Sequence, residues 1–450
     1  MNKVIEVLKN IWKITELKDR ILLTLTMLLV YRFGAQVVLP GIDATKLGQI
    51  AENTEQGILG LLNAFTGGAF ANASVFALGI MPYISASIVV QLMGIAIPYL
   101  DKLKKEGASG QKKITQITRW LTIAICLVQS PAYLTALPAL GIPPDAFLLG
   151  QGGMFYFSSI IILVTGCIFA MWLGEKITDK GIGNGISLLI MVGIIATMPQ
   201  AFVQEWVSRV TESNGGLIMI SIELVIWTAI ILASVMLVMA VRKIAVQYAR
   251  RTASGGFDRN VAGTRQYIPL RLNASGVMPI IFAQAIMFVP ITLVGFSENE
   301  SLQGLAAILT DFAGLWYNVL FFFMIVAFTY FYTAMTVNPN QMADDMKKNG
   351  GFIPGIKPGR ATADYLDNVM SRITFPGSLF LGIVAILPAF AMQGGVNIQF
   401  AQFYGGTSLL ILVGVILDTL QQIESHLLMR HYDGLMESGR IKGKSSGRIM

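Results

Sequence analysis

Residues 217–241 read LIMISIELVIWTAIILASVMLVMAV, a run of 25 residues with one ionisable side chain, Glu223. A helix of about 20 apolar residues is long enough to cross the hydrocarbon core of a bilayer. Similar runs recur along the 450-residue chain, in which 54% of the residues are hydrophobic and 13% are charged. Soluble domains carry about 25% charged residues. The sequence therefore predicts an all-α polytopic membrane protein and excludes a disordered chain, a coiled coil or an ordinary soluble enzyme.

Ten runs of this kind predict ten membrane-spanning helices. They lie at residues 21–39, 75–97, 118–138, 154–174, 184–203, 217–241, 275–295, 315–336, 373–392 and 407–428. Ten spans divide into two groups of five, and an odd number per half means that the second half enters the membrane from the opposite face. The two halves could then form inverted repeats. No convincing sequence identity links residues 1–203 to 217–428, so the repeat is only permitted by the topology.

The positive charges predict how these spans are oriented. Of the 33 Lys and Arg residues, all but Arg32, Lys46 and Arg209 fall in segments on one side of the ten-span topology. Those segments are residues 1–20, 101–119, 175–182, 241–273, 336–372 and the tail from 429. Because cytoplasmic segments of membrane proteins are enriched in Lys and Arg, both termini are predicted to be cytoplasmic.

Two further segments are apolar in part but do not read as spans. Residues 1–20 combine apolar and basic side chains at helical spacing, and they predict an amphipathic helix on the cytoplasmic membrane surface rather than a cleavable signal. Residues 57–72, GILGLLNAFTGGAFAN, are too short and too rich in glycine to cross a bilayer. We expect a half-helix that enters the fold from one side, with a buried loop as the alternative.

The sequence lacks the motifs of common catalytic and metal sites. It contains no G-x-x-x-x-G-K-[ST] loop, no H-E-x-x-H and no C-x-x-C, and it has only two histidines. The ionisable residues within the predicted spans are Arg32, Glu223, Asp418 and Glu424. Structural pairing or snorkelling is favoured for these four. We therefore expect no enzymatic activity, no cofactor and no metal, and a passive conduit whose energy comes from another protein.

Four long segments carry a resemblance to a known family. They are FALGIMPYISASIVVQLM (76–93), GEKITDKGIGNGISLLI (174–190), NPNQMADDMKKNGGFIPGIKPGRAT (338–362) and FYGGTSLLILVGVILD (403–418). In this order they resemble the SecY/Sec61-alpha family of protein-conducting channels, and the likeness extends over nearly the whole chain. The resemblance implies a channel that passes unfolded secretory polypeptides across the bacterial cytoplasmic (inner) membrane. It also implies sideways release of membrane-protein segments into the lipid.

The resemblance also implies the domain organisation. An N-terminal half of spans 1–5 (residues 21–203) and a C-terminal half of spans 6–10 (residues 204–428) would be hinged between spans 5 and 6. They would enclose an hourglass pore that opens to lipid through a lateral gate. The amphipathic helix at residues 1–20 precedes these halves, and a cytoplasmic tail at residues 429–450 follows them.

Residue by residue, the resemblance assigns three parts of the channel. The pore ring is assigned to Ile80, Ile84, Ile186, Ile190, Ile281 and Ile411. The plug lies in the half-helix and is assigned to Leu61, Leu62, Asn63, Phe65, Gly67, Gly68 and Phe70. The lateral gate is assigned to Ser85, Ser87, Gln91 and Gln284. A collar of stiff β-branched side chains would resist ions by dewetting. By sequence alone, isoleucines in membrane helices are in most cases lipid-facing or part of the core, and only the resemblance places these six at a pore. Ordinary interhelical hydrogen bonding would also explain the polar residues.

Two long basic segments, 241–273 and 337–372, are matched to the loops with which the family docks its partners. The matched positions are Arg242, Lys243, Arg250, Arg251, Lys347, Lys348, Lys357 and Arg360. The implied partners are the SecA ATPase, ribosomal RNA phosphates, the SecE and SecG subunits, signal sequences and nascent chains, and anionic phospholipids. Positive-inside topology with phospholipid contact is the simpler explanation of the charge.

Two points stay open at this level. The family often carries arginine where this chain has Lys357, and lysine keeps the charge but loses the bidentate geometry of a guanidinium. An ion-coupled secondary transporter with inverted repeats is the alternative function. Such a transporter would need polar or charged ligands near the bilayer midplane, where the matched positions of this chain are isoleucines.

Overall fold

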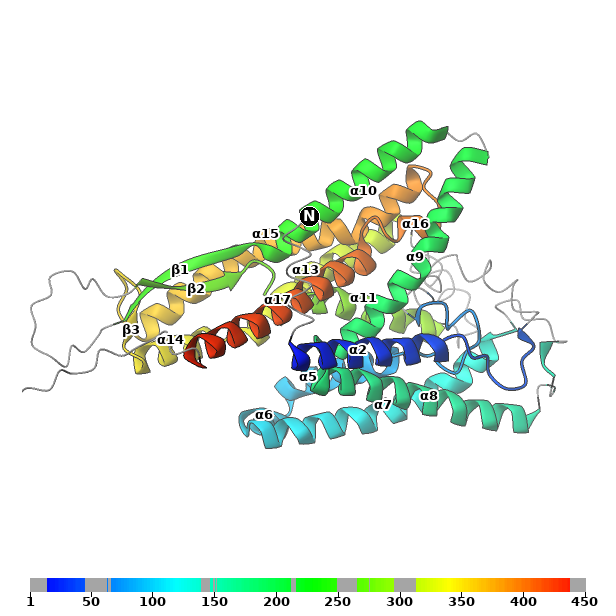
Figure 1. Cartoon of the computed structure of the whole chain (residues 1–450), viewed down its shortest axis with the longest axis horizontal. Helices are drawn as coiled ribbons and strands as arrows, with labels where there is room; N and C mark the ends of the chain where they lie inside the picture. Colours follow the sequence, from blue (N-terminus) through cyan, green and yellow to red (C-terminus); the bar gives the residue numbers. More distant parts are fainter. Residues whose placement is uncertain are drawn as a thin grey trace, which may run out of the picture. The chain divides into compact units, whose positions relative to one another are not determined.

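The computed structural model describes residues 14–44, 63, 66–138, 146–148, 150, 152–211, 216–248, 265–274, 276–294 and 313–437. Within these ranges ten helices overlap the ten predicted spans. Figure 1 labels these helices. They are α2 (Thr15–Gly34), α5 (Met81–Ala96), α7 (Ala108–Ala136), α8 (Gly153–Lys180), α9 (Gly185–Thr211), α10 (Gly216–Met239), α11 (Met278–Val294), α13 (Leu315–Thr336), α15 (Arg360–Gln393) and α17 (Gly406–Glu437). The mainly helical prediction is confirmed.

Several helices are longer than the spans predicted from hydropathy. α7 begins at Ala108 rather than at 118, α15 begins at Arg360 rather than at 373, and α17 ends at Glu437 rather than at 428. Apolar composition marks only the part of a helix that can lie in lipid, whereas helical hydrogen bonding continues into polar turns outside it. The expected surface helix at 1–20 lies mostly outside the described residues, and its last residues already belong to α2.

The helices have the composition of a multi-pass membrane protein. Six of the described helices are long and apolar enough to cross a membrane, and a seventh span results if α5 and α6 (Pro98–Lys105), which meet at a bend of 102°, count as one. On α10, Ile218, Val225 and Met236 are 76%, 68% and 73% exposed. A continuous exposed apolar face of this kind suits lipid rather than water. The count of ten spans stays a prediction.

The chain divides into two compact units, of which the first comprises residues 1–197 and 415–450. The glycine-rich junction between α8 and α9 organises its helices. The N–H of Ile182 donates to Thr24 Oγ1 on α2 (3.1 Å), and the N–H of Gly183 donates to Gln422 Oε1 on α17 (2.8 Å). A Cβ on Gly185 would lie 2.0 Å from the carbonyl oxygen of Gly174 on α8. Glycine at 185 therefore allows α9 to start in direct contact with α8.

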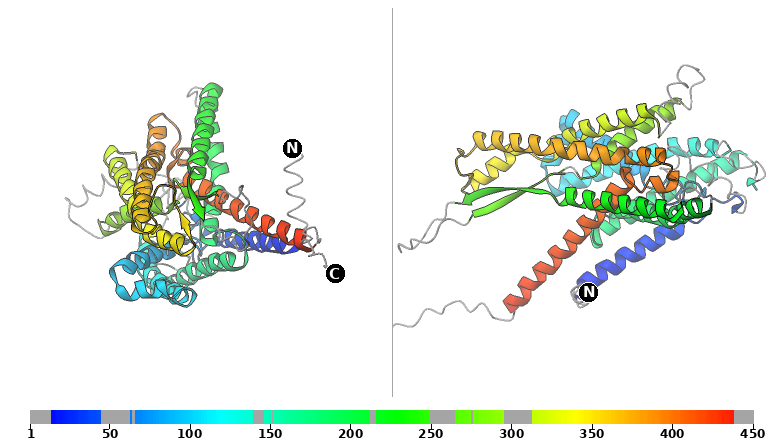
Figure 2. Two further views of the ribbon diagram at one scale, coloured as in Figure 1. Left: turned by 90° about the vertical axis from the view of Figure 1, so that its left-hand side faces the viewer. Right: turned by 90° about the horizontal axis from the view of Figure 1, so that it is seen from above.

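The second unit comprises residues 198–414 and contains a small folded body in place of the two separate basic loops expected from the sequence. β1 (Val241–Tyr248) is the centre of an antiparallel sheet of order β2-β1-β3, with β2 (Arg265–Arg271) and the short β3 (Gly351–Phe352) at its edges. α14 (Pro339–Lys348) and the first turns of α15 pack on this sheet, and all of them remain neighbours in the turned views of Figure 2.

An apolar core holds this body together. It is formed by Ile244, Val246, Leu270, Met346, Ile353, Leu366 and Met370, which are all buried. The register pairs Ile244 with Ile268, so the two long strands present branched side chains beside each other. The all-helical expectation therefore needs one correction, a three-stranded sheet in which both basic segments take part.

The close approach at Gly185 yields a prediction about stability. In Gly185→Ala, the added methyl group must displace the main chain of α8, and such overpacking costs about 1–3 kcal/mol. We expect a lower apparent melting temperature of the detergent-solubilised protein, measured by intrinsic fluorescence. Gly153→Ala is the matched control, because no atom lies within 4 Å of a Cβ built there. Equal melting of the two variants would show that the α8–α9 contact does not limit stability.

Candidate functional site

Four of the six expected pore-ring residues lie in the first unit. Ile80 directly precedes α5 and is buried, and Ile84 follows one turn later and is half-buried. Ile186 is half-buried and Ile190 is buried, one turn apart near the start of α9. Residues four apart on a helix share a face, so each pair forms an apolar stripe along its helix. The α8–α9 junction sets the position of the second stripe, because both isoleucines lie in the first two turns after it.

The other two ring residues belong to the second unit. Ile281 is half-buried in the first turn of α11, and Ile411 is 1% exposed near the start of α17. All six residues are thus helical or at a helix start, and their side chains are buried or half-buried. Their closure into one ring stays a prediction.

The expected plug is described only in its last part. Outside the described residues lie Leu61, Leu62 and Phe65. The N–H of Gly68 donates to the carbonyl of Asn63 (2.8 Å), and the ring of Phe70 packs on Tyr133 with centroids 5.0 Å apart. Gly67 and Gly68 have φ of +65° and +89°. Because two successive left-handed residues end an α-helix, the chain forms turns here instead of the expected continuation of the half-helix.

The polar residues assigned to the lateral gate lie on two helices of different units. Ser85, Ser87 and Gln91 are half-buried on α5, and Gln284 is half-buried on α11. Gln91 Nε2 donates to Ser87 Oγ on its own helix (3.2 Å), whereas the buried Gln91 Oε1 has no hydrogen-bond partner among the described residues. At least one polar atom of α5, Gln91 Oε1, therefore forms no hydrogen bond with a neighbouring described helix.

The expected docking residues gather on the small folded body of the second unit. We define the docking surface as the exposed residues Arg242, Lys243, Lys347, Lys348, Lys357 and Arg360. Arg250 and Arg251 lie outside the described residues. The hydroxyl of Thr362 donates to the carbonyl oxygen of Lys357 (2.9 Å), which holds the main chain of the tip while the lysine side chain is exposed. Two segments far apart in sequence thus present their positive charges from one core.

Sequence reasoning missed a buried ionic cluster in the second unit. Arg209 on α9 pairs with Glu205 one turn earlier (2.9 Å) and with Glu223 on α10 (2.6 Å). The same guanidinium donates to the carbonyl of Gly395 (2.6 Å), and Glu205 Oε2 accepts the N–H of Asn397 (2.8 Å). The structural pairing expected for Glu223 is confirmed. Its partner could have been suspected from the i, i+4 spacing of Glu205 and Arg209.

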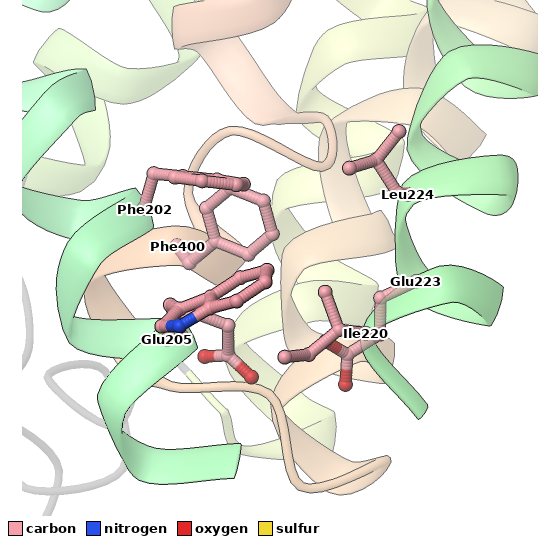
Figure 3. Close-up of a pocket in the computed structure, with 7 residues that line it drawn as sticks. Phe202, Glu205, Ile220, Glu223, Leu224 and Phe400 are labelled. Atoms are coloured by element: carbon pink, nitrogen blue, oxygen red, sulfur yellow. The ribbon is translucent and has the colours of Figure 1, made fainter. Parts of the chain in front are cut away.

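A small pocket lies beside this cluster (Figure 3). It is lined by Phe202, Glu205, Trp206, Ile220, Glu223, Leu224 and Phe400. Figure 3 shows the carboxyl groups of Glu205 and Glu223 directed toward one another from α9 and α10, beneath the ring of Phe400. The three charged side chains are at most 7% exposed. Two carboxylates share one guanidinium in this cluster, and its contacts cross-link α9, α10 and the turn before α16 (Ile398–Ala401).

The comparisons with known proteins agree with this architecture. The SecY family model matches residues 74–420. The protein translocase subunit SecY of Streptomyces coelicolor is 41% identical over 436 residues, which cover 94% of this chain and 98% of the relative.

Solved structures give the same fold. A SecY protein, described as having a plug domain that stabilises the closed state of the translocation channel and maintains a membrane seal, has a TM-score of 0.62 at 17% identity. The match covers 90% of this chain and 91% of that one. Sec61 from the canine ribosome-channel complex of the endoplasmic reticulum has a TM-score of 0.55 at 16% identity, with the same coverage. With its family model matched over most of the length and a close relative covered almost end to end, the chain belongs to the SecY family.

Proposed function

We propose that this chain forms the protein-conducting channel through which unfolded secretory polypeptides cross the cytoplasmic membrane. Membrane-protein segments leave the same channel sideways into the lipid. The observation that carries the proposal is 41% identity to a SecY translocase subunit over 94% of the chain. The comparisons return translocase subunits and protein-conducting channels, so they do not support the alternative of an ion-coupled secondary transporter.

Each of three groups of site residues has its own role in such a channel. Ile80, Ile84, Ile186, Ile190, Ile281 and Ile411 form the collar around the passing polypeptide. Because the collar makes no directional bonds, it accepts any side chain and resists ions by dewetting. The segment around Gly67 and Gly68 is the plug of the resting channel. Ser85, Ser87, Gln91 and Gln284 line the lateral gate, where the unpartnered Gln91 Oε1 offers an acceptor to a donor that enters.

The docking surface receives the partners that supply energy or substrate. Its basic side chains suit the phosphates of ribosomal RNA. The chain has no nucleotide-binding loop, so a partner supplies the energy for transport. We assign that partner, the SecA ATPase, to the same small folded body. The Sec61 channel named above was seen in a complex with a ribosome. SecE and SecG subunits, signal sequences, nascent chains and anionic phospholipids complete the proposed partners. The channel lies in the bacterial inner membrane with both termini in the cytoplasm.

The collar is tested by Ile84→Asn and Ile411→Asn. An unpaired buried amide costs roughly 1–3 kcal/mol, enough to shift a closed–open equilibrium by about five- to a hundredfold. We expect a raised ion leak through the resting channel and transport of preproteins with defective signal sequences. Ile161→Asn is the control, because this isoleucine is 50% exposed on α8. Wild-type leak and wild-type signal selectivity in both collar variants would contradict the assignment.

The docking surface is tested at its tip by Lys357→Glu. We expect SecA-driven transport of a preprotein into vesicles to fall several-fold, because a carboxylate repels an acidic partner surface as well as failing to attract it. The fold should persist, since Thr362 bonds only the main chain of residue 357. Lys357→Arg should transport at least as well as the wild type.

The matched control is Lys112→Glu, a charge reversal at an exposed lysine on α7 in the other unit. Cosedimentation with ribosomes at two salt concentrations gives an independent readout, because binding to phosphates weakens as salt rises. Equal transport by the two glutamate variants, together with salt-independent ribosome binding, would mean that the basic residues of this body only set topology.

A further inference from the structure

Arg32 occupies an unusual place for a charged side chain. It lies in the last turn of α2, the first predicted span, and it is half-buried. Its Nη1 donates a hydrogen bond to the main-chain carbonyl of Gly67 in the expected plug. No carboxylate among the described residues forms an ion pair with Arg32. A charge held away from water needs strong partners, so this carbonyl is a principal reason why the guanidinium can lie there.

Gly67 is seated tightly between two helices. A Cβ at this position would lie 2.8 Å from the Cα of Gly193 on α9 and 3.0 Å from Arg32 Nη1 on α2. Its φ of +65° also disfavours a side chain. The carbonyl of residue 67 therefore reaches Arg32 only while this glycine lies against α9, and the hydrogen bond reports one defined position of the segment.

A second contact holds the same segment three residues later. Tyr133 Oη on α7 donates to the carbonyl of Phe70 (2.8 Å), and the two rings pack together. Both contacts end on main-chain carbonyls. Of the two donors only Arg32 is charged, and hydrogen bonds from charged donors are roughly twice as strong as neutral ones.

We propose that Arg32 is a positioning residue that latches the plug in the closed channel through its hydrogen bond to Gly67. This proposal rests on the plug function of the segment proposed above. A single charge-assisted hydrogen bond biases an equilibrium about ten- to a hundredfold, which is enough to favour the seated segment. The bond is also weak enough to break when a translocating polypeptide takes its place.

The latch is tested in the purified translocase complex by the ion conductance of planar bilayers without substrate. We expect Arg32→Gln to raise the resting open probability about ten- to a hundredfold, and Arg32→Lys to fall between Arg32→Gln and the wild type because it keeps the charge with fewer donors. Gly67→Ala is the second variant. It unseats the segment through steric conflict with Gly193 and leaves the guanidinium in place, so it should leak as Arg32→Gln does.

Deletion of residues 60–70 separates the latch from the plug itself. The deletion should leak, and adding Arg32→Gln to it should change nothing further, because the acceptor carbonyl has been removed. If the deletion leaks but Arg32→Gln has wild-type conductance, the latch is overturned, whereas the plug function of the segment is supported. An equal rise of leak from Arg32→Gln in both backgrounds would also overturn the latch, since it would show a general effect on α2. A deletion that does not leak would overturn the plug function and the latch with it.

Discussion

A main-chain amide or carbonyl that leaves a helix inside a bilayer meets no water, so the protein itself must provide its partner. Several polar contacts of the described residues answer that constraint at three breaks between helices. The side chains that do so are Thr24 and Gln422 at the α8–α9 junction, Arg32 and Tyr133 at the turns before α5, and Glu205, Arg209 and Trp227 around α16. The irregular segments of a channel can exist in the membrane because these few polar residues bond them.

The sequence predicted the helices well because lipid imposes a simple rule on length and polarity. Each of the ten apolar runs coincides with a described helix. The proposed collar was beyond such reasoning, because the buried Ile411 and the exposed Ile161 have the same side chain, and only the resemblance to a family assigns one of them to a pore. The Arg32–Gly67 contact was also unpredictable, since its acceptor is a main-chain oxygen that carries no residue identity.

The small sheet shows a different limit. Its strands lie in segments rich in charged and turn residues, which favour loops. The strand partner of β1 can also be distant in sequence, because Gln247 pairs with Phe352. In β1, only the alternation of buried Ile244 and Val246 with more exposed neighbours marks a strand. Strand pairing over such a distance depends on the tertiary fold, so local patterns could indicate the basic surface but not its architecture.

α15 runs without a break from Arg360 on the docking surface to Gln393, a length of 34 residues or about 51 Å. Leu366 lies in the core of the small folded body. Further along the helix, the carbonyl oxygen of Val384 would lie 2.4 Å from a Cβ on Gly405, which directly precedes α17, the helix that carries Ile411. One continuous helix therefore connects the docking surface to the start of α17. If this helix tilts as one body by a few degrees, its far end moves by several ångströms, so a small adjustment at the docking surface is amplified along its length.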